Sequence, residues 1–421
     1  MTRLLIIADD FTGALDTGVQ FSKRGISTQV CVYQDIDWKM LYNDIEVLVV
    51  DTESRHLNAG EAYQRVYQLC CQAKISGIRY FYKKTDSTLR GNIGAELSAL
   101  VDACNLSELP FIPAYPKTGR ITKNGYQYVD GVLLHETAFG RDPLDPVNDA
   151  YIPNIINEQT NKIVNSIILL NDIWNKLDGL PGDISVFDAI CEEDMVQILH
   201  FLDKMKDVTA VAGCAGFAPY LVDLFSLEIA EYKILKTAYL PALVVCGSVN
   251  DISIAQTEYA EMAGVKSKLL SLTELLKKSN SDSQVHKSYI KSILDGLSRD
   301  GCFILKTASG KEDVISLLDQ AKGYKNQDLY EGIAEGIGFL VKQIVKCYTI
   351  GTLVIFGGDT AIGIIHQLDC KGIFPKTELM PGIVLSQIDC SDFQGVLITK
   401  AGGFGEVEGL MDIISYIREG E

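Results

Sequence analysis

Short apolar runs, each followed by a polar or glycine-containing turn and then by a stretch with helical periodicity, repeat along this chain of 421 residues. In the first repeat, the apolar run 4–8 leads through Asp9 and Asp10 into a stretch whose small and apolar residues fall on one helical face. Strands that alternate with helices predict an α/β fold built on mostly parallel, doubly wound sheets. Uninterrupted apolar strands are typical of sheets covered on both faces.

Two series of such repeats predict two domains. The apolar runs are 4–8, 30–33, 47–50, 80–83, 185–188 and 208–213 in the first half and 242–246, 302–306, 353–356 and 395–399 in the second. We place the domains at residues 1–235 and 240–421 and expect the active site in the cleft between them. Proline and glycine are frequent between residues 108 and 150, which is typical of a functional loop or hairpin.

The charge of the chain limits its partners. It carries 38 Lys and Arg against 55 Asp and Glu, a formal net charge of −17. An acidic surface repels nucleic-acid phosphates and anionic lipid headgroups, so we expect neither partner. No run approaches the ~20 apolar residues of a membrane-spanning helix. A few local cations can still hold a small anionic substrate.

The cysteines predict the compartment. There are eleven, with no C-x-x-C spacing and only five His elsewhere, which is not the layout of a zinc site. The N-terminus runs into a strand without a signal-peptide pattern. We therefore expect a cytoplasmic protein with free thiols. The oligomeric state is left open, with a homodimer as one option.

Three apolar runs in the second half end in small residues. They lead into Gly247-Ser248, Gly357-Gly358-Asp359-Thr360 and Ala401-Gly402-Gly403. Glycines at strand ends let backbone N–H groups approach phosphate oxygens, and a following helix adds its positive end. Each turn alone could be an ordinary strand-to-helix turn, but three in one domain indicate nucleotide binding. Neither the P-loop spacing nor G-x-G-x-x-G is present, which disfavours a dinucleotide dehydrogenase.

Two polar loops follow strands in the first half. Carboxylates such as Asp9 and Asp10 can orient a hydroxyl, accept its proton or bind Mg²⁺, although Asp10 could equally cap the next helix. The segment Lys84–Gly91 puts two cations, a carboxylate and three hydroxyls into eight residues. Within it, Arg90 has the planar fork that binds carboxylates. Asn92 is placed as the N-cap of the following helix.

On these motifs the chain resembles the four-carbon acid sugar kinase family over nearly its whole length. The matching segments are Ala8–Ala14, Lys83–Asn92, Pro113–Pro116, Asp130–Val132, His135–Thr137, Arg141–Pro143, Gly247-Ser248, Gly357–Ala361, Pro381-Gly382 and Lys400–Gly405. The resemblance implies ATP-dependent phosphorylation of the terminal hydroxyl of threonate, erythronate or 3-oxo-tetronate. It also implies that the N-terminal domain holds the sugar acid and the C-terminal domain holds the nucleotide, with Mg²⁺ bridging its phosphates.

The residue chemistry and the resemblance together assign the site. The predicted substrate-binding residues are Asp9, Asp10, Lys84, Asp86, Ser87, Arg90 and Gly91. By resemblance, the ATP contacts are Ser248, Gly357, Gly358, Asp359, Thr360 and Gly402. Asp86 is predicted as the base that aligns the attacking hydroxyl, with Asp10 and Asp359 as alternatives, and no Mg²⁺ ligand is assigned.

The chain departs from the family pattern at two nucleotide turns. Val249-Asn250 stands where the family commonly has Cys-Ser, and Ala401-Gly402-Gly403 where it has Ser-Gly-Asn. Two other functions stay open on the sequence: a nicotinamide-dependent sugar-acid dehydrogenase, and a sugar-acid-binding regulator without catalytic activity.

Overall fold

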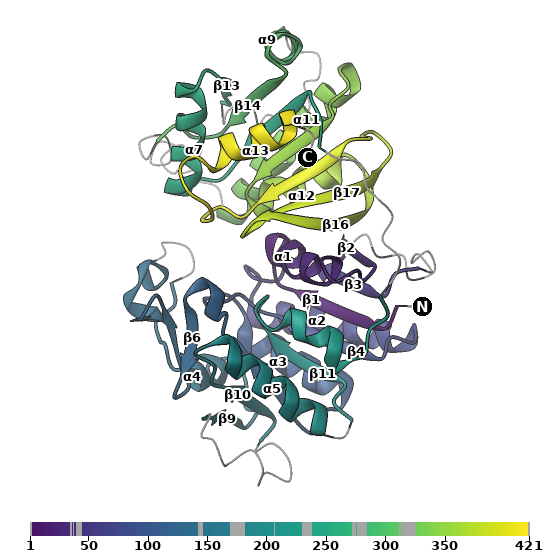
Figure 1. Cartoon of the computed structure of the whole chain (residues 1–421), viewed down its shortest axis with the longest axis vertical. Helices are drawn as coiled ribbons and strands as arrows, with labels where there is room; N and C mark the ends of the chain where they lie inside the picture. Colours follow the sequence, from purple (N-terminus) through teal and green to yellow (C-terminus); the bar gives the residue numbers. More distant parts are fainter. Residues whose placement is uncertain are drawn as a thin grey trace. The chain divides into compact units, whose positions relative to one another are not determined.

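The computed structural model describes residues 2–33, 36, 38, 44–141, 146–168, 182–205, 207–229, 238–271, 275, 284–310, 313 and 326–419. The chain divides into two compact units, Met1–Glu231 and Tyr232–Glu421 (Figure 1). The boundary predicted near residues 235–240 stays a prediction, because residues 230–237 lie outside those described. So does the predicted cleft between the domains.

The first unit is built on a parallel sheet. Its strands run in the order β2-β3-β1-β4-β11-β5-β10-β9, and every neighbouring pair is parallel. The strands are β1 (Leu4–Ala8), β2 (Thr28–Val32), β3 (Val47–Asp51), β4 (Tyr80–Lys84), β5 (Leu109–Ile112), β9 (Val164–Ile167), β10 (Ile184–Phe187) and β11 (Ala210–Gly213). Every residue of β1, β2 and β3 is buried, as the apolar runs predicted.

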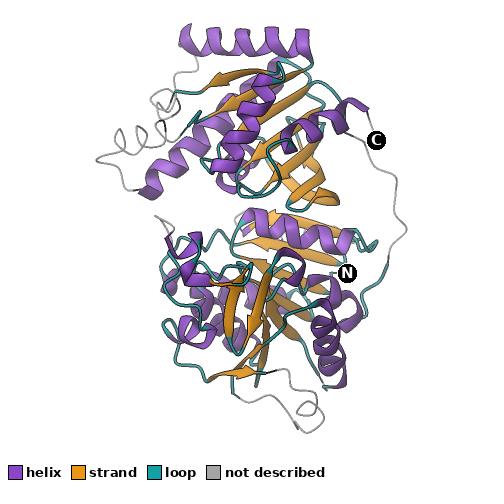
Figure 2. Cartoon of the chain, turned by 60° about the vertical axis from the view of Figure 1, so that its left-hand side comes forward, coloured by secondary structure: helices purple, strands orange, loops and turns teal. Residues whose placement is uncertain are grey.

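Helices cover both faces of this sheet (Figure 2). They are α1 (Phe11–Ser22), α2 (Ala59–Ile75), α3 (Ile93–Cys104), α4 (Ile152–Asn157), α5 (Glu192–Lys204) and α6 (Leu221–Leu224). Leu5 and Ile7 of β1 belong to one core cluster with α2 and α3, and α1 packs on β1–β4 outside that cluster. The predicted doubly wound α/β fold is confirmed.

The proline- and glycine-rich segment forms a small antiparallel sheet of its own. It comprises β6 (Arg120–Lys123), β7 (Tyr126–Val129) and β8 (Val132–Leu133), with short 3₁₀ turns around it. Gln127 of β7 donates through Nε2 to the Ser87 carbonyl at 3.0 Å, so this sheet supports the loop after β4.

The second unit has a mixed sheet in the order β13-β14-β12-β15-β18-β17-β16. The strands are β12 (Ala242–Cys246), β13 (Lys266–Leu269), β14 (Cys302–Lys306), β15 (Thr352–Phe356), β16 (Cys370–Met380), β17 (Ile383–Cys390) and β18 (Val396–Lys400). The first five in this order are parallel, whereas β17 pairs antiparallel with both β18 and β16. The sequence did not predict this antiparallel ribbon.

Helices again pack on both sides of the strands. The helices of this unit are α7 (Asp251–Met262), α9 (Gln284–Asp300), α11 (Asn326–Cys347), α12 (Gly358–Gln367) and α13 (Gly409–Glu419). Apolar residues of α7 and α13 share one core cluster with the sheet, while α11 and α12 pack against each other outside it.

Two sequence-based expectations about this fold need correction or comment. Cys370 and Cys390 form a disulfide, so the expectation of free thiols is wrong for this pair. The two residues face each other in the antiparallel register of β16 and β17, which the sequence did not reveal.

No helix in the described ranges is long and apolar enough to span a membrane.

Candidate functional site

The first polar site lies where the strand order of the first unit reverses. From β1 the chain adds β3 on one side and β4 on the other. Ligands of open α/β sheets bind outside the carboxyl ends of the strands at such a switch point. Ala8 of β1 pairs in register with Lys84 of β4 and with Asp51 of β3, so the residues that follow these three strands emerge side by side.

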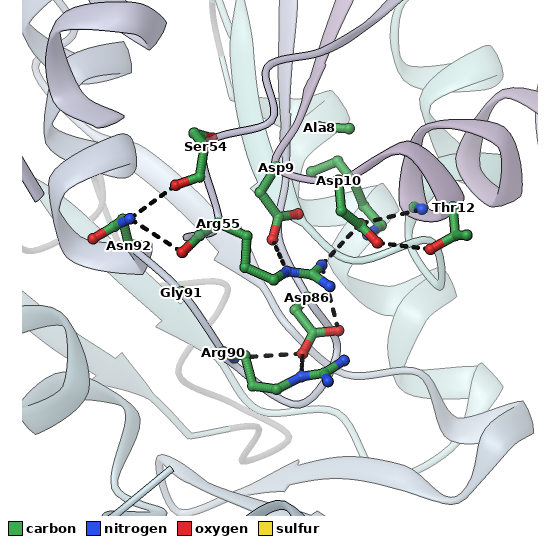
Figure 3. Close-up of polar contacts among 12 residues, drawn as sticks. Ala8, Asp9, Asp10, Thr12, Ser54, Arg55, Asp86, Arg90, Gly91 and Asn92 are labelled. Carbon is green, nitrogen blue, oxygen red and sulfur yellow. Dashed lines mark hydrogen bonds and ion pairs between the residues drawn. The ribbon is translucent and has the colours of Figure 1, made fainter. Parts of the chain in front are cut away.

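Arg55, which follows β3, organises the acidic residues at this edge (Figure 3). Its Nε lies 2.7 Å from Asp9 Oδ2, and its Nη2 lies 2.8 Å from Asp10 Oδ1 and 3.9 Å from Asp86 Oδ1. A single guanidinium, 11% exposed, thus holds carboxylates from two different loops. We call Asp9, Asp10, Arg55, Lys84, Asp86 and Arg90 the charged cluster.

The Asp86 carboxylate is bonded to other residues of its own loop. Its Oδ2 accepts hydrogen bonds from Arg90 Nε at 2.7 Å and from Thr88 Oγ1 at 2.5 Å. Burial alone would raise the pKa of Asp86, but the Arg90 and Arg55 guanidinium groups and these hydrogen bonds outweigh it and hold that pKa well below its usual value. The Asp86 carboxylate is therefore held ionised, with Oδ2 occupied by Arg90 and Thr88.

Arg90 keeps one edge of its guanidinium open. Nε is bonded to Asp86, and the group lies 5.6 Å from the ring centre of Phe139. Within the described part of the chain neither Nη atom has a hydrogen-bond partner. The outer Nη1–Nη2 edge can therefore receive a carboxylate through two parallel bonds.

A buried oxygen of the charged cluster lacks a hydrogen-bond partner among the described residues, and a buried cation lies near it. Asp9 Oδ1 is a buried acceptor with no donor, and Lys84 is 4% exposed. Burial lowers the pKa of Lys84, but the carboxylates of Asp9, Asp10 and Asp86 outweigh that effect and raise it. An unused buried acceptor beside a cation is an arrangement that can receive a hydroxyl.

Gly13 leaves room for this cation. A Cβ built on Gly13 would lie 2.5 Å from Lys84 Nζ and also in contact with Asp10 Oδ1. Asp10 also caps α1, because its Oδ1 accepts from Gly13 N at 3.2 Å. Capping and site function, which the sequence offered as alternatives for Asp10, therefore coexist.

The loops that carry the charged cluster hold left-handed residues. Glu53 has φ 48° and the buried Leu89 has φ 58°. Such conformations in non-glycine residues persist where the surroundings over-determine them, commonly at ligand sites. Gly91, with φ 88°, lets its loop approach Arg55, whose Cγ would lie 3.1 Å from a Cβ there.

Asn92 does not act as predicted. It occupies the N-cap position of α3, but its side chain makes no capping bond. Its Nδ2 donates instead to the carbonyls of Ser54 at 2.9 Å and Arg55 at 3.4 Å (Figure 3). It also donates to the Leu57 carbonyl at 2.8 Å. Asn92 therefore fixes the backbone of the Arg55 loop.

The second site lies at the corresponding switch point of the other unit, between β12 and β15. Ser248 follows β12, and the turn Gly357–Thr360 follows β15. A Cβ on Gly357 would lie 3.5 Å from Ser248 N, and a Cβ on Gly402 would lie 2.8 Å from Ser248 Oγ. The three glycine turns singled out in the sequence therefore converge. We call Gly247, Ser248, Gly357–Thr360 and Gly402 the glycine cluster.

The turn after β15 has the features of a phosphate site. Gly357 has φ 104° and precedes α12, whose N-terminus carries no side-chain cap. The first N–H groups of a helix have no partner within it, and the helix dipole adds positive potential there. Gly358 is the first residue of α12 and its φ is not left-handed, so the backbone requirement for glycine falls on Gly357. Asp359 is exposed in the first turn.

The structure brings together the predicted residues of each site and adds one that the sequence did not reveal. Asp9, Asp10, Lys84, Asp86 and Arg90 lie in one cluster; Ser87 is half-buried next to them in the chain. Arg55 was missed, although Thr52-Glu53-Ser54-Arg55 is a polar stretch directly after an apolar strand, the same signal that marked Asp9 and Asp10.

Two family matches divide the chain as the two units do. Residues 4–221 match a family described as a sugar-binding N-terminal domain, and residues 243–410 match a nucleotide-binding C-terminal domain. The charged cluster lies in the first match and the glycine cluster in the second.

Curated relatives cover nearly the whole chain. A D-threonate kinase of Salmonella typhimurium is 32% identical, with 99% of each chain covered. A D-erythronate kinase of Heliobacterium modesticaldum is 26% identical, covering 99% of this chain and 97% of the relative. A 3-oxo-tetronate kinase of Haemophilus influenzae is 24% identical, covering 95% and 96%.

Two solved structures share the fold. A Salmonella typhimurium protein described as a putative tRNA synthase superposes with a TM-score of 0.81 at 21% identity, covering 99% of this chain and 100% of that one. A Haemophilus influenzae protein superposes with a TM-score of 0.73 at 20% identity, covering 98% and 99%. At these identities the likeness concerns the fold alone.

Proposed function

Because this chain belongs to the four-carbon acid sugar kinase family, we propose that it transfers the γ-phosphoryl group of ATP to the terminal hydroxyl of threonate, erythronate or 3-oxo-tetronate. Sugar-acid kinases are phosphotransferases, so the dehydrogenase and the non-catalytic regulator are no longer alternatives. The observation that carries the proposal is the pairing of two sites at sheet switch points, one charged and one rich in glycine.

The charged cluster is suited to a polyhydroxy acid. The open edge of Arg90 would bind the substrate carboxylate through two parallel bonds. Asp9 Oδ1, an acceptor without a partner in the described structure, and the buried Lys84 near it would bind hydroxyls. A hydroxyl both accepts and donates, so it satisfies both groups at once.

Asp10 is the better candidate to align the attacking hydroxyl, ahead of Asp86. The Asp10 side chain is 22% exposed, against 12% for Asp86 and 2% for Asp9. Its pKa is lowered, because Arg55, Lys84 and the Thr12 hydroxyl outweigh the opposing effect of burial. In phosphoryl transfer the carboxylate mainly positions the hydroxyl, which a low pKa does not prevent.

The glycine cluster would hold the nucleotide. Backbone N–H groups of Gly358, Asp359 and Thr360 at the start of α12 would meet phosphate oxygens, and Ser248 and Gly402 would line the same place. Protein carboxylates commonly give Mg²⁺ only one or two ligands beside phosphates and water, so the exposed Asp359 fits this ion. When bound, Mg²⁺ offsets the negative charge of the phosphates.

A coupled assay of ADP release tests the proposal. With MgATP, we expect ADP above background only when a four-carbon sugar acid is present, and at different rates for threonate, erythronate and 3-oxo-tetronate. Mass spectrometry of the product should show one added phosphoryl group on the acid. Background ADP release with all these acids, from a protein that binds ADP normally, would contradict the substrate assignment.

A further inference from the structure

A buried lysine lies directly beneath the nucleotide turn of the second unit. Lys400 is the last residue of β18 and is fully buried. Its Nζ donates to the carbonyls of Gly402 at 2.9 Å and Ala401 at 3.1 Å and to Ser253 Oγ at 3.2 Å. Since an ammonium group has three N–H donors, all of them are used.

Helix α7 ties down the same turn from the other side. Ser253 Oγ donates to the Gly402 carbonyl at 2.7 Å, and Gln256 Nε2 donates to the carbonyls of Phe404 at 3.2 Å and Glu406 at 2.7 Å. The Lys400 carbonyl also accepts a bond from Gly357 N at 3.2 Å, which links the turn after β18 to the turn after β15. Lys400 therefore lies between both phosphate-binding turns.

The charge of Lys400 has no carboxylate partner in the described structure. Two other buried lysines of the strands do: Lys83 of β4 lies 2.9 Å from Glu96 Oε2, and Lys306 at the end of β14 lies 2.6 Å from Glu261 Oε1. Among the described residues, Lys400 Nζ contacts carbonyls, a hydroxyl and the ring of Phe356, whose centre is 4.7 Å away. A buried cation without a counter-ion is costly unless something else supplies the opposite charge.

We propose that Lys400 holds the Ala401–Gly402 turn in its nucleotide-binding conformation and that the phosphates of the bound nucleotide supply its missing counter-charge. This inference rests on the proposed function, since it needs ATP or ADP at the glycine cluster. Lys400 acts as a positioning residue, because its donors are spent on the turn and it influences the phosphates through the backbone and the electric field.

The titration of Lys400 makes the inference measurable. Burial lowers the pKa of Lys400 to about 8. The titratable group that acts on it is Cys246 of β12, whose own pKa burial raises to about 11, so that Cys246 remains a thiol at pH 8. The acidic residues of the loop, Glu406 and Glu408, are exposed, and the neighbours from α7 and β15 are uncharged. Added phosphate charge should raise the pKa of Lys400 and cause proton uptake.

Calorimetric titration with MgADP in buffers of different ionisation enthalpy measures this uptake. For the wild-type protein we expect uptake approaching half a proton near pH 8 and little at pH 6.5, where Lys400 is already protonated. Lys400→Met should abolish the uptake and weaken MgADP binding roughly 10- to 150-fold, the range expected for one lost charged hydrogen bond.

Two further variants separate this role from general stability. Lys306→Met also removes a buried strand-end lysine but leaves Lys400 in place, so it should keep the proton uptake even if it melts earlier. Ser253→Ala removes a support of the turn with little change in volume, and we expect several-fold weaker MgADP binding with the uptake kept. Unchanged binding by Ser253→Ala would overturn the positioning role.

The outcomes also distinguish this inference from the proposed function. Wild-type binding of MgADP without proton uptake at pH 8, or unchanged affinity in Lys400→Met, would overturn the inference alone. Absence of MgADP binding to the wild-type protein would overturn the proposed function and this inference with it.

Discussion

The two arginines of the charged cluster, Arg55 and Arg90, have different roles. Arg55 is turned inward onto Asp9 and Asp10, whereas Arg90 uses Nε on Asp86 and leaves its outer edge open. A guanidinium can do both things at once, since it presents five donors in a rigid fork. A lysine ammonium is a compact point charge and cannot present one edge to Asp86 and another to a substrate.

We therefore expect Arg90→Lys to impair the enzyme although it keeps the charge. Losing one charge-assisted bond to the substrate carboxylate costs about 1.5–3 kcal/mol, or roughly 10- to 150-fold. If that contact is the same in the ground and transition states, the loss appears mainly in KM for the sugar acid, while KM for ATP moves little. Steady-state kinetics with each substrate varied in turn measures both constants.

Arg24→Lys is the matched control for this variant. Arg24 also forms a two-pronged pair, with Asp223 at 2.7 and 2.9 Å, but on an exposed surface away from the charged cluster. The Arg24→Lys substitution should leave both KM values at the wild-type level. If Arg90→Lys lowers Tm and leaves the sugar-acid KM unchanged, Arg90 only anchors its loop to Asp86.

Two neighbouring glycines in the turn between β15 and α12 are needed for different reasons. Gly357 has φ 104°, which L side chains rarely adopt, yet a Cβ there would meet nothing closer than 3.5 Å. Glycine is therefore needed at position 357 because of the backbone conformation, not because of a close neighbour. Gly358 lies in helical conformation, so its glycine is needed only if a ligand approaches its backbone.

Alanine substitutions should therefore separate stability from binding. Gly357→Ala should lower the free energy of unfolding by about 1–3 kcal/mol. Gly358→Ala should leave it unchanged or raise it by up to about 1 kcal/mol, while weakening MgADP binding because the methyl group stands in the way of the phosphate. Urea unfolding and calorimetry measure the two effects. A Gly358→Ala protein with normal MgADP affinity would remove this backbone position from the site.

Because the molecule has two compact units with separate cores, we expect each ligand to stabilise one unit. The core around α2 and α3 contains only residues of the first unit, and the core around α13 only residues of the second. A ligand stabilises the unit that binds it, by about 2.7 kcal/mol at 100 times its Kd.

Differential scanning calorimetry should resolve two transitions. MgADP should raise one of them by about 5–10 °C, and a non-reactive sugar acid should raise the other. At the same MgADP concentration the Lys400→Met protein should show at most about half of the first shift and keep the second. A single transition that both ligands raise equally would show that the two units unfold as one cooperative body.

Much of both sites could be predicted from the sequence because their residues are local. Asp9-Asp10 and Lys84–Gly91 follow apolar strands within a few residues, and strand ends of a parallel sheet share an edge. The three glycine turns were recognisable for the same reason. Local order along the chain thus determined the α/β alternation, the character of each site and most of its residues.

The remaining features depend on which strands become neighbours. Arg55 gains its role because β3 lies beside β1, and Lys400 because β18 lies beside β15 and beneath a turn held by α7. The pairing of Cys370 with Cys390 and the bonds of Asn92 likewise depend on contacts that periodicity does not encode. A strand reveals which of its residues are buried, but only the folded sheet decides which charge each of them meets.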